Sequence, residues 1–365
     1  MGKLTYTLIA LLSFLLCSCS EKKNVPICEE NISAQAVIVD PANRKIWPKF
    51  LYGDILCAWK IDYYGGKLTK NEWQKADSMF VAGHGHNEFG LILLSQDNSG
   101  SLYLLNHPMM GDKLVSLTRI SHANSFVEIK NEDNWERFNL KELPPIYCDG
   151  ENFVVLSDSS ILVAGAPIKD MEHVFSVIDF KNQRIKPLNY WPDDGSKCSD
   201  FAKHRIYAGH CILLGNGKGR FLYKNEYCKQ AFIFSIDGTA VNVHKDLYSE
   251  TLDYSAGSTK FDFVINKKST ERLACCCDAE NIYLLCRDSD SKGNKLDKYK
   301  DPFIFGNRIE VYDWDGVMKK IIHLDKYGQN IMLSADGHTI FLFSDYSDET
   351  PEPKIYSYDL NKNNP

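Results

Sequence analysis

Short apolar runs alternate with short polar segments along almost the whole chain. The runs are three to five residues long, and the segments between them are rich in Asp, Asn, Ser and Gly, which favour tight turns. Two such runs joined by a turn predict a β-hairpin. The paired runs are 91–94 with 101–105, 153–156 with 161–164, 212–214 with 220–223, 273–277 with 282–285, and 331–333 with 339–342.

A second strand-turn-strand unit follows several of these hairpins. It consists of an apolar strand that ends near an Asp, a polar turn, and another strand, at 177–188, 232–243 and 309–324; residues 355–360 begin the same unit. Two successive hairpins make a four-stranded antiparallel sheet. Repetition of such a sheet is typical of a β-propeller, and about six repeats of roughly 50–60 residues are present.

The last repeat has only three predicted strands, so a fourth must come from elsewhere. Residues 34–40 have the composition of a strand and no other obvious partner. We therefore expect an all-β fold: a six-bladed β-propeller of four-stranded antiparallel blades over residues 34–365, closed by this N-terminal strand. Closure would remove the unpaired sheet edges that invite aggregation. A short helix or a loop is expected only at 70–79.

One motif supports this assignment through a family resemblance. Residues 83–89 read Gly-His-Gly-His-Asn-Glu-Phe. This segment resembles the Gly-x-Gly-Pro-x-Glu-Phe motif of TolB-like six-bladed β-propeller lipoproteins, with His86 in place of the usual Pro. The resemblance covers nearly the whole chain after residue 33 and implies the propeller fold. It implies little about activity, because the function of that family is largely unassigned.

The first residues predict export and a lipid anchor. Lys3 precedes an uncharged apolar run, Leu4 to Leu16, which is too short to span a bilayer but suits a signal peptide. Leu16-Cys17-Ser18-Cys19 resembles a bacterial lipobox, so residues 1–18 are expected to be a signal peptide and Cys19 the acylated N-terminus. Residues 19–33 are expected to form a polar tether. Ser20 is not Asp, which by lipoprotein sorting rules favours the outer membrane of the cell envelope.

The charge of the mature chain argues against nucleic-acid binding. Without residues 1–18 it carries 41 basic and 48 acidic side chains, a net charge of −7, and a nucleic-acid-binding protein would present a basic face. No second apolar stretch is long enough for a membrane span.

Cysteines are numerous but show no metal-binding spacing. No Cys-x-x-Cys pair occurs, and Cys275, Cys276 and Cys277 lie in an apolar strand pattern, with the first and last on one face. Burial as small apolar side chains is the favoured interpretation. Disulfides and a thiolate metal site with Cys286 are the alternatives.

Two clusters are candidate ligand surfaces. His84, His86 and Glu88 could chelate a metal if they lay on one face of a strand, although the adjacent glycines favour a structural turn. The segment with Trp191, Asp193, Asp194, His204 and Arg205 is the densest polar and aromatic cluster outside the predicted strands. We predict it as part of a recognition surface.

No linear catalytic, phosphate-binding or dinucleotide-binding motif is present. The favoured function is therefore a non-catalytic, lipid-anchored binding module for an envelope protein or glycan, with no cofactor. The alternative is an envelope lyase or hydrolase acting on glycans or peptides, since the loops of separate propeller blades can assemble a site without a linear motif.

Overall fold

The computed structural model describes most of the predicted propeller. The described residues are 27–39, 47–59, 63–82, 88–107, 114, 116–121, 125–148, 150, 152–259, 262–267, 274–287, 305–344 and 354–361. Residues 1–18, with the predicted signal peptide, lie outside them, as do Cys19, His84 and His86.

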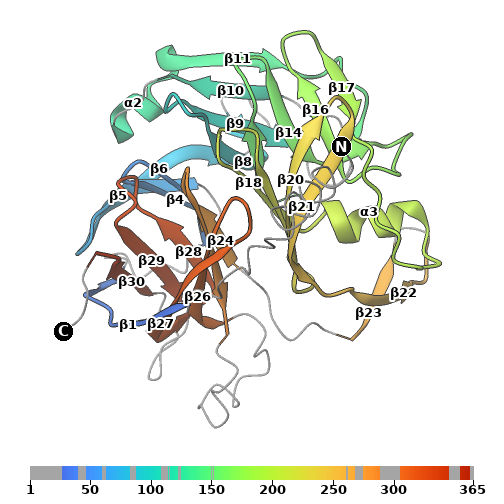
Figure 1. Cartoon of the computed structure of the whole chain (residues 1–365). Coiled ribbons are helices and arrows are strands. Elements are labelled where there is room, and N and C mark those ends of the chain that lie inside the picture. Colours follow the sequence, from blue (N-terminus) through green and yellow to red (C-terminus); the bar gives the residue numbers. More distant parts are fainter. Residues whose placement is uncertain are drawn as a thin grey trace, which may run out of the picture.

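Six antiparallel sheets of four strands, the blades, surround a common axis (Figure 1). Blade 1 contains β3 (Trp47–Tyr52), β4 (Ile55–Trp59), β5 (Tyr63–Leu68) and β6 (Trp73–Ala82). Blade 2 contains β8 (Leu91–Gln96), β9 (Leu102–His107), β10 (Ser116–Ile120) and β11 (Trp135–Asn139). Blade 3 contains β13 (Phe153–Val155), β14 (Ser160–Ala164), β16 (Phe175–Asp179) and β17 (Arg184–Pro187).

The second half of the ring repeats this arrangement. Blade 4 contains β18 (Cys211–Gly215), β19 (Phe221–Asn225), β20 (Gln230–Asp237) and β21 (Ala240–Ser249). Blade 5 contains β24 (Ala274–Cys277), β25 (Asn281–Cys286), β26 (Gly306–Asp313) and β27 (Met318–Gly328). Blade 6 contains β28 (Asn330–Leu333), β29 (Thr339–Ser344), β30 (Lys354–Asp359) and β2 (Ala36–Val39).

The first strand of each blade lies innermost. The inner strands β3, β8, β13, β18, β24 and β28 contact one another in sequence, and β28 contacts β3 to complete the circle. Every hairpin predicted from the apolar runs is present.

Six clusters of buried residues fill the six interfaces between neighbouring blades. Successive side chains of a strand point to opposite faces of its sheet, so one strand supplies two interfaces. In β19, Tyr223 packs with Phe175 of blade 3, whereas Leu222 packs with Cys275 of blade 5. Burial on both faces explains why the strands read as continuous apolar runs.

The N-terminal strand closes the ring as predicted. β2 pairs antiparallel with β30, with Ala36 opposite Ser357 and Val39 opposite Lys354. Ile38 is 2% exposed and packs between blades 6 and 1, and Val37, on the other face of β2, is 50% exposed.

Two further strands extend blades 5 and 1. β1 (Cys28–Ile32) pairs parallel with β27, and the short β7 (Glu88–Phe89) pairs parallel with β6. The expectation of a polar tether over residues 19–33 is therefore wrong for residues 28–32. The polar side chains of β1 have partners on β27. Oε2 of Glu30 lies 3.3 Å from Nζ of Lys320, and Oε2 of Glu29 lies 3.6 Å from Nε2 of His323.

A few helices and short strands do not belong to the six blades. They are α2 (Phe126–Lys130), a 3₁₀ turn at Glu132–Asn134, α3 (Asp200–Ala208), and the paired strands β12 (Ile146–Tyr147) with β15 (Ala166–Pro167) and β22 (Asp253–Ala256) with β23 (Phe263–Lys267). The expected helix or loop at 70–79 is instead largely β6, because Trp73, Met79 and Phe80 face blade interfaces. None of the helices in the described part of the chain is long and apolar enough to cross a membrane.

Candidate functional site

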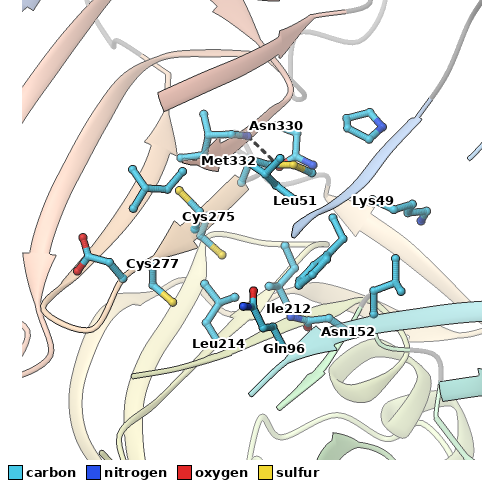
Figure 2. A pocket seen from close by; sticks show the side chains of 18 of the residues that line it. Lys49, Leu51, Gln96, Asn152, Ile212, Leu214, Cys275, Cys277, Asn330 and Met332 are labelled. Atoms are coloured by element: carbon cyan, nitrogen blue, oxygen red, sulfur yellow. Dashed lines mark hydrogen bonds between the residues drawn. The ribbon is translucent and has the colours of Figure 1, made fainter. Parts of the chain in front are cut away.

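A cavity of about 1100 Å³ lies along the axis of the ring. All six inner strands line it, from Leu51 in β3 to Met332 in β28 (Figure 2). The loops of a propeller converge at the two ends of this axis, which makes the cavity the place where residues from separate blades meet. Its volume slightly exceeds the range typical of small-molecule sites, about 300–1,000 Å³.

The middle of the cavity is apolar. Alternate residues of the inner strands point inward there; Leu51, Ile212, Leu214 and Met332 are seen around the space in Figure 2. This alternation follows from the pleat of each strand. An apolar middle suits the hydrocarbon part of a ligand.

Two cysteines of β24 also line the cavity. Cys275 and Cys277 of β24 both point toward the cavity, as the alternation in the sequence predicts (Figure 2). No disulfide joins Cys275, Cys276 or Cys277. Burial raises the pKa of Cys275 to about 12 and also raises the pKa of Cys277. These side chains are therefore neutral thiols at pH 7, in keeping with the predicted role as small apolar groups.

One end of the cavity, which we call the acidic mouth, is where the inner strands end in turns. Asp278, Glu280 and Asp336 line it. Asp278 accepts hydrogen bonds from the Tyr283 hydroxyl at 3.0 Å and from the backbone N–H of Glu280 at 2.7 Å. Asp336 accepts one from the Ser334 hydroxyl at 2.5 Å, and this bond lowers its pKa. Both acids thus stabilise the turns of their own hairpins.

The other end, which we call the lysine mouth, is where the inner strands begin. Lys49, Lys224, Lys354 and Glu226 line it. The side chain of Lys224 is only 2% exposed, and its Nζ lies 3.9 Å from Oε1 of Glu226. Asn152 joins two inner strands here: its Oδ1 accepts a hydrogen bond from the Leu213 N–H at 2.8 Å. The two mouths therefore carry opposite charges.

The predicted recognition surface around Trp191 and α3 is largely a folded core. Asp194 has a side chain only 4% exposed. Its carboxylate accepts hydrogen bonds from the hydroxyls of Tyr207 at 2.8 Å and Tyr254 at 2.5 Å, and Nζ of Lys203 lies 3.1 Å away. The Lys203 ammonium also donates to the carbonyl of Pro192. The network ties the segment before α3 to α3 and to β22.

The other residues of this cluster are divided between the interior and the surface. His204 is fully buried, and its Nε2 lies 3.3 Å from the Tyr147 carbonyl oxygen. Trp191 packs under the Lys203 ammonium, and Arg205 lies over Phe263. Asp193 is exposed. None of the five predicted residues lines the axial cavity.

The predicted trio of His84, His86 and Glu88 is described only at Glu88, which begins β7. The adjacent Phe89 is buried against Phe80 and Trp135. This packing agrees with a structural junction at the start of blade 2. Within the described ranges, no group of three or more His, Cys, Asp or Glu side chains is placed to hold a metal ion.

Lys224 is the residue that sequence reasoning missed. Its signal was present: a lysine lies inside the apolar strand Phe-Leu-Tyr-Lys-Asn, all five residues of which are buried. A lysine is almost never fully buried without a specific role. Its position at the cavity, however, depends on the packing of blade 4 against blade 5.

Comparison with known proteins identifies no family for this chain. No protein-family model and no curated protein matches the chain. Among solved structures, a DUF4221 family member from Bacteroides vulgatus is 10% identical with a TM-score of 0.47, covering 90% of this chain and 97% of that one.

Two further solved structures have the same level of identity, 10%, and a TM-score of 0.42. They are a gluconolactonase from Xanthomonas campestris, covering 90% of this chain and 87% of that one, and the β-propeller domain of Cps50 (Swd1) from Myceliophteria thermophila, covering 87% and 98%. We take no functional argument from such distant matches. The six-bladed fold follows from the strand topology, and the TolB-like resemblance stays a prediction.

Proposed function

We propose that this protein is a lipid-anchored binding module of the bacterial cell envelope that takes a largely apolar ligand into the axial cavity of its propeller. The observation that carries the proposal is the cavity itself: about 1100 Å³, with an apolar middle and polar groups at both mouths. Pockets with this distribution of groups bind small molecules by burying an apolar body and orienting it with a few polar contacts. The neutral thiols of the wall favour binding over covalent chemistry there.

A fluorescence experiment tests the binding site. N-phenyl-1-naphthylamine is an uncharged apolar fluorophore whose emission rises when it leaves water. We expect saturable binding to the wild-type protein and weaker binding to Leu214→Trp, because the indole ring takes up space in the apolar middle of the cavity.

The matched control is Val317→Trp, which adds the same ring at a side chain that is 52% exposed. It should bind the fluorophore like the wild type. Equal binding by Leu214→Trp and wild type would mean that the fluorophore sits elsewhere, and the cavity would lose its assigned role.

The anchor is tested separately. The proposal predicts that cells expressing the wild-type chain incorporate labelled palmitate into the protein, and that Cys19→Ala abolishes the labelling and releases the protein from the membrane fraction. Retention of Cys19→Ala in that fraction, or an unlabelled wild type, would contradict the lipid anchor while leaving the cavity proposal intact.

A further inference from the structure

Lys224 has an unusual environment for a lysine. It is the fourth of the five residues of β19, opposite Ile212 of β18 and Ala231 of β20, and its side chain is 2% exposed. Its neighbours Leu222, Tyr223 and Asn225 are completely buried. An ammonium group in such a place has lost most of its hydration, which is unfavourable unless other groups replace the water.

The described residues do not replace that water. An ammonium has three N–H donors, but in the described part of the chain Nζ of Lys224 makes no hydrogen bond; its one ion-pair partner is Glu226, at 3.9 Å. That distance is too long for a hydrogen bond. Because Lys224 lines the axial cavity, its unused donors are available to whatever enters the cavity.

The surroundings favour an anion over a neutral acceptor. Lys49 and Lys354 line the same mouth, and among the described residues that line it Glu226 is the one acidic side chain. Glu226 is 27% exposed and lies 3.9 Å from Nδ1 of His210, so its charge is partly directed away from the cavity. The excess of cations at this mouth attracts negatively charged ligands.

The charges of the acidic mouth determine which way round an anionic ligand lies in the cavity. Asp278, Glu280 and Asp336 lie there, and they would repel an anionic group. Between the mouths lie the apolar side chains of the inner strands, such as Leu214 and Met332. A ligand that matches this sequence of environments has an anionic head at the lysine mouth and an aliphatic body in the middle of the ring.

We propose that the axial cavity binds an aliphatic monocarboxylate, whose carboxylate accepts hydrogen bonds from the Lys224 ammonium while its hydrocarbon chain lies along Leu214 and Met332. This inference rests on the proposed function, because it names the class of ligand for the same cavity. A charge-assisted hydrogen bond in a site shielded from water is strong and specific for the charged head.

Displacement of N-phenyl-1-naphthylamine by decanoate and by 1-decanol, both below their aggregation limits, tests the proposal. The two compounds have the same hydrocarbon chain length and differ in the charge of the head. We expect decanoate to bind the wild type at least about tenfold more tightly than 1-decanol, the effect of one hydrogen bond to a charged group.

Three variants locate the effect. Lys224→Met should remove the preference for decanoate and leave the affinity for 1-decanol unchanged. Lys181→Met is the matched control, because Lys181 is 42% exposed and its Nζ pairs with Asp158, and neither residue lines the cavity; it should behave like the wild type. Glu226→Gln should strengthen decanoate binding severalfold, because the competing carboxylate is gone.

The outcomes separate the two proposals. Equal affinities for decanoate and 1-decanol in the wild type, or an unchanged preference in Lys224→Met, would overturn the carboxylate proposal while the apolar site stands. Failure of the fluorophore to bind the cavity would overturn both. If Lys224→Met does not fold, Glu226→Gln decides: unchanged or weaker decanoate binding would contradict the role of Lys224.

Discussion

Two buried charges in this protein have opposite surroundings. The Asp194 carboxylate is surrounded by donors from Tyr207, Tyr254 and Lys203, whereas the Lys224 ammonium lines a cavity and makes no hydrogen bond to a described residue. A charge whose hydrogen bonds are satisfied inside the protein belongs to the fold. A buried charge without such bonds needs another explanation, and a ligand is one.

The first prediction concerns Asp194. Burial alone would raise the pKa of its carboxyl group, but the hydrogen bonds from Tyr254, Ser196, Tyr207 and Lys203 outweigh this effect and lower the pKa to about 2, from an ordinary value of 3.8. Since the folded state holds the deprotonated form more tightly, this stability is present above about pH 4 and is lost as the pH falls toward 2. Asp194→Asn should therefore reduce the free energy of unfolding by about 2 kcal/mol at pH 7.

Urea unfolding at pH 7 and pH 3 checks this prediction. The difference between Asp194→Asn and the wild type should be smaller at pH 3. Asp158→Asn is the control, because the Asp158 side chain is 73% exposed and pairs only with the exposed Lys181; it should change little. A difference for Asp194→Asn that does not depend on pH would show that the carboxylate charge is not what matters.

At the level of single elements, β1 is the clearest departure from the sequence expectation. Its residues Cys-Glu-Glu-Asn-Ile are mostly polar and exposed, with burial confined to Ile32. Such a strand lies at the outer edge of blade 5, where one side faces solvent. The side chain of Ile32 joins the cluster between blades 5 and 6, and the Ala34 N–H donates to Asp325 at 2.9 Å.

The second prediction is that Ile32 secures this strand. Ile32→Ala should lower the free energy of unfolding by about 2 kcal/mol, since it removes a largely buried aliphatic side chain. It should also speed hydrogen exchange in β27, the neighbour of β1. Ile27→Ala is the matched control at a side chain that is 47% exposed. Similar small effects of the two variants would mean that β1 contributes nothing to blade 5.

For the whole molecule, the pairing of β2 with β30 joins the two ends of the described chain. Without it, β30 would present an open edge, and blades 6 and 1 would lose Ile38 from their shared cluster. Figure 1 shows β30 and β29 next to the blue strands from the start of the chain. Closure of this kind couples all blades, because each blade depends on two neighbours.

The third prediction compares adjacent residues of β2. Ile38→Ala should lower the stability of the whole ring by about 2–4 kcal/mol, because its side chain is fully buried between two blades. Val37→Ala, at an exposed position on the opposite face, should cost less than about 0.5 kcal/mol.

Calorimetry provides the measurement. Ile38→Ala should shift one cooperative transition to lower temperature as a whole. A second, separate transition for blades 6 and 1, or equal melting temperatures for the two variants, would be incompatible with a closed ring that unfolds as one unit.

The sequence by itself determined the inner hairpins of blades 2 to 6 and the closing strand. Alternation of apolar residues and turns of Asp, Asn and Gly are local signals, and hairpins such as β18–β19 form between neighbours in the chain. Ala36–Val39 could be assigned to blade 6 because the repeat count left one strand missing.

Only the tertiary structure decided the rest, because it depends on residues far apart in the sequence. β1 pairs parallel with β27, about 290 residues later in the chain, and no turn in the sequence indicates this pairing. The sequence placed Asp194 on a recognition surface, but in the folded chain it accepts a hydrogen bond from Tyr254, which is 60 residues away in the sequence. The cavity exists because six inner strands surround one axis. Lys224 lines this cavity because blade 4 packs against blade 5, and the sequence does not show that packing.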